Sequence, residues 1–255
     1  MNEARPSLVI LAGPNGAGKS TVAPALLNGA LAVNEFVNAD VIASGLSAFH
    51  PESAAIAAGR VMLARLRELA AQRVSFAFET TLASRSFAPW LRDLATSGYD
   101  IHMLFLWLPS ADFALDRVAE RVRSGGHDIP PDTVRRRYRS GLHNFFSLYE
   151  PIVSTWRLYD SSGSEPRLIA TRLESQPIRV YDEGVWSAAK PQTNVMRTDA
   201  QKDIHRIFVE DGRVIDEALK QGVREAMLRH KRDGLPVVIY RDGKSVLVKP
   251  EDLGY

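Results

Sequence analysis

The segment Gly13-Pro14-Asn15-Gly16-Ala17-Gly18-Lys19-Ser20 decides the fold of this chain. It has the spacing of the Walker A phosphate-binding loop. The run before it, residues 8–12, is continuously apolar, as in a parallel strand buried on both faces. Glycines let backbone N–H groups turn towards a phosphate, and a following helix adds the positive end of its dipole. The alternative, a strand-to-helix turn with an incidental lysine, explains little of this context.

Composition limits the classes of protein to which the chain can belong. It has 255 residues, of which 45% are hydrophobic and 24% charged, as in an ordinary globular protein. The net charge of +2 gives no argument for a nucleic-acid or anionic-membrane partner, and the lack of cysteine excludes disulfides and thiolate metal sites. No signal peptide and no apolar stretch of about 20 residues is visible. We therefore expect a cytoplasmic protein with no membrane or nucleic-acid partner.

Strand and helix patterns alternate along most of the chain. Strand patterns follow the first one at residues 36–40, 75–79, 101–108, 156–160 and 168–173, and helical patterns separate them. Such βαβ units predict an α/β fold with a parallel sheet of the P-loop kinase type, flanked by helices.

The C-terminal part differs in pattern from the rest. We expect a kinase-like domain at residues 1–186, an aperiodic linker at 187–195 and a small unit at 196–255. The small unit is predicted to hold one long helix, residues 214–232, and a hairpin around Asp242-Gly243. Because so few elements make a poor core, this unit should pack on the first domain or on a partner.

The phosphate loop predicts ATP and Mg²⁺ as cofactors. Lys19 should reach the β- and γ-phosphates, and the Ser20 hydroxyl should ligate Mg²⁺. The residues expected to bind the nucleotide are Gly13, Asn15, Gly16, Ala17, Gly18, Lys19, Ser20 and Thr21.

Two carboxylates end predicted strands, where parallel sheets bind their ligands. Asp40 could act as the general base that accepts the proton of a substrate hydroxyl, or it could merely cap a helix that begins at Val41. Glu79, followed by Thr80 and Thr81, could hold substrate hydroxyls or a magnesium-bound water. Its alternative role is a helix cap before Ser86.

A third candidate feature is the basic segment from Arg117 to Arg139. It contains seven arginines together with Gly125-Gly126 and Pro130-Pro131, which suit a hinged lid. Arginines on such a lid can neutralise the charge that develops during phosphoryl transfer, and we expect one or two of the seven to do so. The alternative is a solvated helix face.

Taken together, these residues resemble the zeta-toxin family of bacterial toxin–antitoxin systems, in its shorter branch. The matching segments are residues 13–21, 38–43, 51–60, 78–82 and 123–138, and they cover most of residues 7–175 in order. The Gly125-Gly126-His127 segment with Pro130 and Arg135 to Arg137 is a more specific sign of this family than the phosphate loop.

The resemblance implies an ATP-dependent kinase that phosphorylates the sugar 3′-hydroxyl of UDP-N-acetylglucosamine or a related nucleotide sugar. It implies Asp40 as the base and Glu79 with Thr81 as substrate contacts. Among the lid arginines it points to Arg123 and Arg136 as phosphate clamps.

The C-terminal unit resembles the small antitoxins that accompany such toxins, above all at residues 218–231 and 234–244. This implies a kinase silenced by its own antitoxin-like segment, in cis or in trans from another copy. The alternative is a helix and hairpin that complete the edge of the sheet.

Two other functions remain open on the sequence alone. A small-molecule kinase for a nucleoside, dinucleotide or antibiotic would share Lys19, Ser20 and Asp40 and differ only in its acceptor pocket. A P-loop switch without enzymatic activity would act through the C-terminal unit, and the absence of a phosphorylated product would distinguish it.

Overall fold

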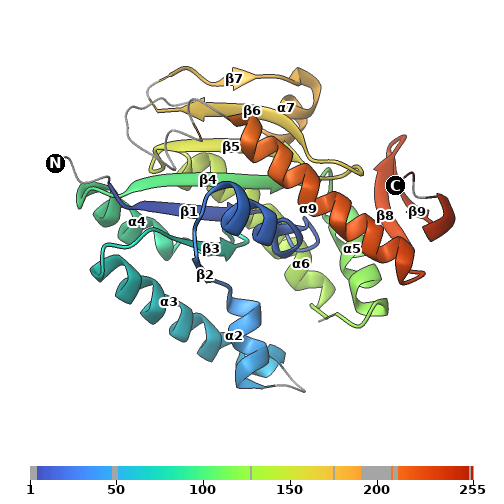
Figure 1. Cartoon of the computed structure of the whole chain (residues 1–255), viewed down its shortest axis with the longest axis horizontal. Helices are drawn as coiled ribbons and strands as arrows, with labels where there is room; N and C mark the ends of the chain where they lie inside the picture. The colour runs from blue at the N-terminus through green and yellow to red at the C-terminus, as the bar shows by residue number, and fades with distance from the viewer. Residues whose placement is uncertain are drawn as a thin grey trace.

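The computed structural model describes residues 5–47, 51–126, 128–174, 176–190, 208, 212–252 and 254. Within them, seven strands form one sheet in the order β2-β3-β1-β4-β5-β6-β7 (Figure 1). Their bounds are β1 Ser7–Ala12, β2 Glu35–Val37, β3 Phe76–Thr80, β4 Asp100–Trp107, β5 Thr155–Asp160, β6 Arg167–Leu173 and β7 Arg179–Val180. The predicted P-loop kinase-type sheet is confirmed.

The sheet is parallel only in part. Strands β2, β3, β1, β4 and β5 run parallel, whereas β6 pairs antiparallel with β5 and β7 antiparallel with β6. The short connection between β5 and β6 explains this, since six residues cannot make the crossover that a parallel pair requires. The expected parallel arrangement therefore holds for five strands, whereas the strand predicted at residues 168–173 runs antiparallel.

Helices cover both faces of the sheet. Their bounds are α1 Lys19–Ala23, continued by a wider helical turn Pro24–Ala30, α2 Ala39–Leu46, α3 Ala55–Ala71, α4 Phe87–Thr96, α5 Ala111–Arg123, α6 Pro131–Asn144, α7 Glu183–Ala189 and α9 Gly212–Arg232. One apolar cluster packs α3, α4 and α7 on the sheet, and a second packs α1, α5 and α9 on the opposite face. Buried residues of β1 serve both clusters, which accounts for its unbroken apolar run.

The expected linker does not begin where it was predicted. Helix α7 runs across residue 186 to Ala189, and its Trp186 stacks on Trp156 of β5 with ring centroids 6.0 Å apart. The first domain therefore extends at least to Ala189. The remainder of the expected linker, residues 191–195, and the start of the small unit lie outside the described residues.

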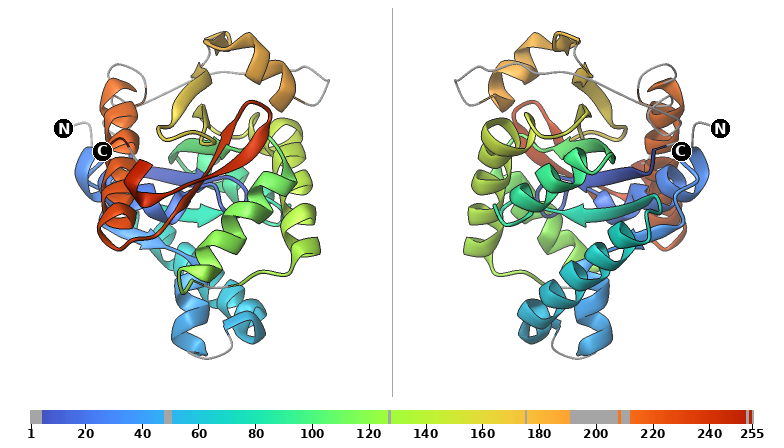
Figure 2. Two further views of the ribbon diagram at one scale, coloured as in Figure 1. Left: turned by 90° about the vertical axis from the view of Figure 1, so that its right-hand side faces the viewer. Right: turned by 90° about the vertical axis from the view of Figure 1, so that its left-hand side faces the viewer.

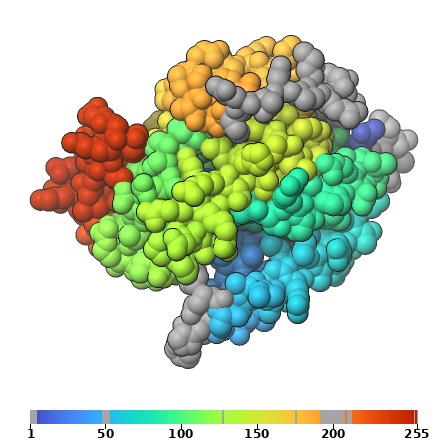
Figure 3. All heavy atoms as spheres, turned by 180° about the vertical axis from the view of Figure 1, so that it is seen from behind, coloured from blue at the N-terminus to red at the C-terminus, as the bar shows by residue number. Residues whose placement is uncertain are grey.

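The C-terminal unit packs on the first domain, as expected. Helix α9 lies against α1 and the turn that follows it, as Figure 1 shows. Strands β8, Val237–Arg241, and β9, Lys244–Val248, form the predicted hairpin with Asp242-Gly243 at its tip. Figure 2 shows the hairpin from two further sides. From behind, it stands out from the body of the molecule beside α5 (Figure 3).

The hairpin does not extend the main sheet. Its two strands pair only with each other in the described part of the chain, so the alternative role of completing a sheet edge was wrong. Instead, β8 and β9 pack against α5.

Candidate active site

The phosphate loop lies between β1 and α1, at the carboxyl end of the central strand. Its backbone needs glycine: Gly13 has φ of +141°, and a Cβ atom there would lie 2.3 Å from the carbonyl oxygen of Leu106 in β4. Gly18, with φ of +84°, begins the helix that carries Lys19 and Ser20. The Ser161 hydroxyl, just after β5, donates a 2.9 Å hydrogen bond to the carbonyl of Ala17. A neighbouring strand end therefore holds the loop in place.

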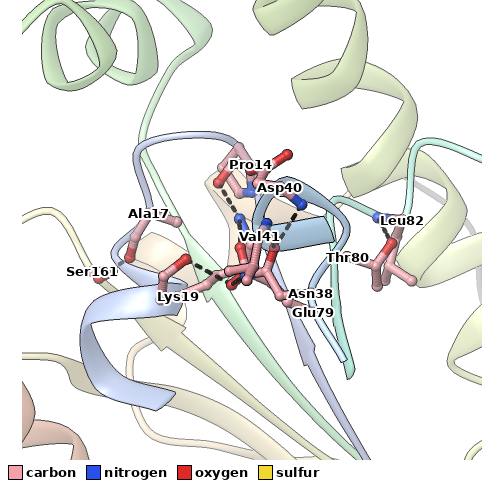
Figure 4. A network of polar contacts seen from close by, with 11 residues as sticks. Pro14, Ala17, Lys19, Asn38, Asp40, Val41, Glu79, Thr80, Leu82 and Ser161 are labelled. Atoms are coloured by element: carbon pink, nitrogen blue, oxygen red, sulfur yellow. Dashed lines mark hydrogen bonds and ion pairs between the residues drawn. The ribbon is translucent and has the colours of Figure 1, made fainter. Parts of the chain in front are cut away.

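Lys19 is buried in this loop. Its Nζ donates to the carbonyl of Pro14 at 2.9 Å and lies 3.5 Å from Oε1 of Glu79 (Figure 4). Burial lowers the pKa of the Lys19 ammonium, and the carboxylates of Glu79 and Asp40 act in the opposite direction. An ammonium held at a phosphate loop can pair with the oxygens of a bound phosphate.

Glu79 joins three parts of the site. Its Oε2 accepts hydrogen bonds of 2.7 Å from the Ser20 hydroxyl and of 2.7 Å from the Asn38 side-chain amide. Together with the Lys19 contact, this brings the end of β3 onto the phosphate loop, as Figure 4 shows. Glu79 does not cap a helix, because α4 begins only at Phe87.

Asp40 does not end a strand. Strand β2 ends at Val37, and the Asn38 side chain caps α2 by accepting hydrogen bonds from the backbone N–H groups of Asp40 and Val41. The cap is therefore Asn38, and Asp40 lies in the first turn of the helix. Its side chain is exposed and borders the same cavity as Lys19, Ser20 and Glu79. The two candidate carboxylates thus come together, although one reaches the site from a helix.

The segment after β3 is fixed by α6. A Cβ atom on Gly141 of α6 would come within 2.1 Å of the carbonyl oxygen of Thr81, so only glycine permits this approach. The side-chain amide of Asn144 donates to the carbonyl of Leu82 at 2.8 Å. The Thr80 hydroxyl accepts a hydrogen bond from the backbone N–H of Leu82 at 3.0 Å. Thr80 therefore stabilises the turn, and the half-buried Thr81 lies between the turn and the basic helix α6.

The three consecutive arginines of α6, Arg135-Arg136-Arg137, lie in different environments. Arg135 pairs with Asp112 of α5 at 2.8 Å, and Arg136 is exposed. Burial lowers the pKa of Arg137, whereas the Asp40 carboxylate raises it, which places Arg137 on the side of the candidate base. The family resemblance had pointed to Arg136. Helical phase could have separated the three, because α6 turns its buried Val134 and Gly141 towards the core.

The arginines of α5 also divide. Arg123 forms an ion pair with Glu120 and is mostly exposed, whereas Arg117 and Arg121 border the cavity at the phosphate loop. The Arg117 guanidinium donates to the carbonyls of Ser161 and Ser162, at 2.7 and 3.1 Å, and lies over the Phe113 ring. The phosphate-clamping roles of Arg123 and Arg136 stay predictions, and the described geometry offers Arg121 and Arg137 as arginines that the sequence did not single out.

A cavity of about 430 Å³ lies beside the phosphate loop. The phosphate loop, Asp40 and Glu79 line one part of it, and α5 and the residues after β5 line another. The C-terminal unit contributes residues of both α9 and β8.

Magnesium fits the oxygen donors at the phosphate loop. The Ser20 hydroxyl is exposed beside the Glu79 carboxylate, and both are hard oxygen ligands of the kind Mg²⁺ prefers. No cluster of three or more His, Asp or Glu side chains that could hold a metal occurs among the described residues. A magnesium ion here would therefore depend on the phosphates of the nucleotide as well as on Ser20.

The fold and this site define a P-loop phosphotransferase. Comparison with known proteins agrees: the zeta toxin family matches residues 1–164, more than half of the chain. The chain belongs to the zeta toxin family.

Individual proteins similar to this chain share 30% or fewer of the aligned residues with it. An uncharacterized protein of Haemophilus influenzae is 30% identical over 130 residues, which cover 51% of this chain and 91% of that protein. In the crystal structure of AvrRxo1-ORF1:AvrRxo1-ORF2 with sulphate ions, the similar chain has a TM-score of 0.61 at 16% identity, covering 88% of this chain and 77% of that one. The PezAT toxin–antitoxin system of Streptococcus pneumoniae gives a TM-score of 0.53 at 14% identity, covering 87% and 86%. These two structures establish a shared fold.

None of the helices in the described residues combines the length and apolarity needed to cross a membrane.

Proposed function

We propose that this chain transfers the γ-phosphate of ATP, bound with Mg²⁺, to a sugar hydroxyl of UDP-N-acetylglucosamine or a related nucleotide sugar. One observation carries the phosphotransfer chemistry. Glu79 from β3 is bonded to Ser20 and lies 3.5 Å from Lys19, and Asp40 from α2 borders the same cavity. Two carboxylates therefore flank the place where a γ-phosphate would lie.

The residues divide the reaction between them. Asp40 accepts the proton of the acceptor hydroxyl as its oxygen forms a bond to the γ-phosphorus, and the bond from that phosphorus to the β–γ bridging oxygen breaks to release ADP. Lys19 balances the charge on the phosphates, Arg121 borders the same cavity, and Arg137 interacts with the Asp40 carboxylate. Ser20 and the phosphates would hold a magnesium ion, which would supply further charge neutralisation.

The choice of acceptor rests on family membership and on the acceptor side of the site. Glu79 lines the cavity, and Thr81 follows it in the segment whose backbone contacts Gly141. Hydroxyl groups of a sugar pair well with a carboxylate and a threonine hydroxyl.

The proposal also includes control of the site by the C-terminal unit, in the manner of an antitoxin. The two solved neighbours belong to paired systems, the complex AvrRxo1-ORF1:AvrRxo1-ORF2 and the PezAT toxin–antitoxin system. In this chain, α9 and β8 border the cavity at the phosphate loop. Two roles fit that position: exclusion of ATP, as the resemblance implies, or formation of one side of its binding site.

The direct test is mass spectrometry of the product after incubation of the full chain with ATP, Mg²⁺ and UDP-N-acetylglucosamine. A product heavier by one phosphate, absent with Lys19→Ala, supports the proposal. A phosphorylated product that forms only with other nucleotides or sugars would contradict the acceptor and keep the kinase. Nucleotide binding without any transferred phosphate would favour a P-loop switch.

A further inference from the structure

The cavity at the phosphate loop is lined by two chemically different sets of residues. One set is polar and comprises the backbone of the loop, Lys19 and Ser20. The other set is aliphatic and comprises Val223, Ala226 and Met227 of α9, Val237 and Val238 of β8, and Pro166 of the β5–β6 connection. Phosphate oxygens gain nothing from such a surface, whereas the flat apolar faces of a nucleobase are buried well by it.

The α9 residues at the cavity follow a helical spacing. Val223, Ala226, Met227 and His230 recur at intervals of three and four, so they share one face of the helix. Gly222 lies beside this face, where a Cβ atom would approach Cα of Val22 in α1 to 3.0 Å. Because α1 begins at Lys19, the helix that carries the phosphate loop and the helix that carries the apolar residues are in direct backbone contact.

Hydrogen bonds also hold strand β8 against the first domain. The buried guanidinium of Arg117 donates to the carbonyl of Val238 at 2.9 Å and, from its other nitrogens, to the residues that follow β5. The backbone N–H of Tyr240 donates to the carbonyl of Ser162 at 2.9 Å. Burial lowers the pKa of Arg117 to about 10, and the Asp160 carboxylate acts in the opposite direction, so the guanidinium stays charged at neutral pH. These bonds tie β8, α5 and the end of β5 into one wall of the cavity.

Helix α9 is also part of the hydrophobic core. Ile215 and Leu219 are completely buried on the face of the sheet formed by β1 and β4, in the same apolar cluster as Tyr159. The polar contacts of α9 with the first domain run to β5, whereas Lys19 bonds within the phosphate loop and to the end of β3. The unit therefore lines a cavity that Gly16, Gly18 and Ser20 of the phosphate loop also line.

We propose that the C-terminal unit forms the nucleobase half of the nucleotide site, with Val223, Ala226, Met227 and Val238 as the surface on which the base of ATP lies. This inference rests on the proposed phosphotransferase function and adds to it. The phosphate loop binds the triphosphate, and the C-terminal unit supplies the affinity for the base. On this proposal the unit promotes ATP binding instead of preventing it.

The test separates the base from the phosphates in the full-length protein. Ala226→Trp places a large ring in the cavity from a half-buried position, and isothermal titration calorimetry measures the Kd for Mg²⁺-ATP and for Mg²⁺-tripolyphosphate. We expect ATP affinity to fall about tenfold or more and tripolyphosphate affinity to change less than about twofold. Leu228→Trp is the matched control, because Leu228 is 44% exposed and lies outside the cavity.

Other results of this experiment would overturn the proposed base site or separate it from the proposed enzymatic activity. Unchanged or tighter ATP binding by Ala226→Trp would overturn the proposal, and tighter binding would favour the inhibitory role. An equal loss of both ligands would also overturn it, because the change would then act on the phosphates. A wild-type chain that prefers ATP to tripolyphosphate but transfers no phosphate to any acceptor would uphold the base site and contradict the phosphotransferase function.

Discussion

At the residue scale, Lys19 and Asp40 are expected to have different roles in the site, which single substitutions can distinguish. Lys19 is buried among the phosphate-loop atoms, whereas the Asp40 side chain is exposed at the border of the cavity. Loss of the lysine should therefore affect the nucleotide, and loss of the carboxylate should affect the proton transfer.

We expect Asp40→Asn to lower kcat by about 10² to 10⁴, the usual contribution of a general base, while the Kd for ATP stays within about threefold of wild type. Asparagine keeps the shape of the side chain and cannot accept the proton. Single-turnover kinetics and calorimetry measure the two effects, and Lys19→Ala should lose transfer altogether. Wild-type turnover by Asp40→Asn would show that another group is the base.

Tyr138 offers a test based on pH. Its hydroxyl donates to the carbonyl of Leu108 at 2.8 Å, and burial raises the pKa of Tyr138 to about 12. The folded state therefore holds this proton more tightly than the unfolded state, whose pKa is about 10. The resulting stability is complete below about pH 10 and is lost as the pH rises from about 10 to 12.

We expect Tyr138→Phe to lower the free energy of unfolding by about 1 kcal/mol at about pH 8, the usual value of one hydrogen bond. The difference from wild type should shrink between about pH 10 and 12. Urea unfolding at several pH values measures both effects. Tyr181→Phe is the control, because Tyr181 is 55% exposed, and an equal pH response of both variants would contradict the assignment.

At the scale of elements, helix α6 positions the acceptor side of the site. Its Gly141 touches the backbone of Thr81, and its Asn144 holds the carbonyl of Leu82. The helix thereby links the basic face near Asp40 to the residues after β3. The helix that carries the arginine run also fixes the segment expected to bind the acceptor.

We expect Gly141→Ala to lower the free energy of unfolding by about 1–3 kcal/mol, because the added methyl group would overlap the Thr81 carbonyl. The KM for the acceptor should rise more than the KM for ATP. Gly59→Ala in α3 is a matched control with open space around the glycine, and it should be neutral or stabilise by up to about 1 kcal/mol. Urea unfolding and steady-state kinetics compare the two, and equal behaviour would argue against a special contact at Gly141.

At the scale of the whole molecule, the C-terminal unit and the first domain share one core. Arg157 of β5, only 5% exposed, pairs with Asp216 of α9 at 3.3 Å, and the Tyr159 hydroxyl donates to the same carboxylate at 2.5 Å. Arg157 also donates to the carbonyl of Phe208, whose ring stacks on His102. The C-terminal unit is thus attached to the centre of the sheet.

We expect Asp216→Ala to lower the free energy of unfolding by about 2–3 kcal/mol, because it leaves a buried guanidinium without its carboxylate. Affinity for ATP should fall with it if α9 carries the base site. Glu217→Ala is the control: its pair with Lys220 is exposed and should contribute less than about 1 kcal/mol. Urea unfolding followed by tryptophan fluorescence would measure both, and a similar small loss in the two variants would contradict a structural role for the Arg157–Asp216 pair.

The sequence by itself determined the parts of this protein that local rules govern. The phosphate loop, the alternation of strands and helices, and the Asp242-Gly243 hairpin follow from glycine placement and from apolar patterns within short windows. Family motifs added Asp40 and Glu79 to the same site, and the structure brings both to one cavity. The loop, the strand and helix pattern and the hairpin depend on residues that are close together in the chain. Asp40 and Glu79 could be identified because they lie in characteristic motifs.

Only the tertiary structure decided which distant residues meet. Helical phase separates the arginines of the run by exposure, but their partners depend on packing between separate helices: Arg135 pairs with Asp112, Arg136 is exposed to solvent, and Arg137 interacts with Asp40. The antiparallel direction of β6, the cap of α2 at Asn38 and the place of the C-terminal unit were likewise undecided or wrong. Helix α9 lies at the cavity beside the phosphate loop because Gly222 fits against α1 and Asp216 meets Arg157, contacts that join residues far apart in the chain and that no local pattern encodes.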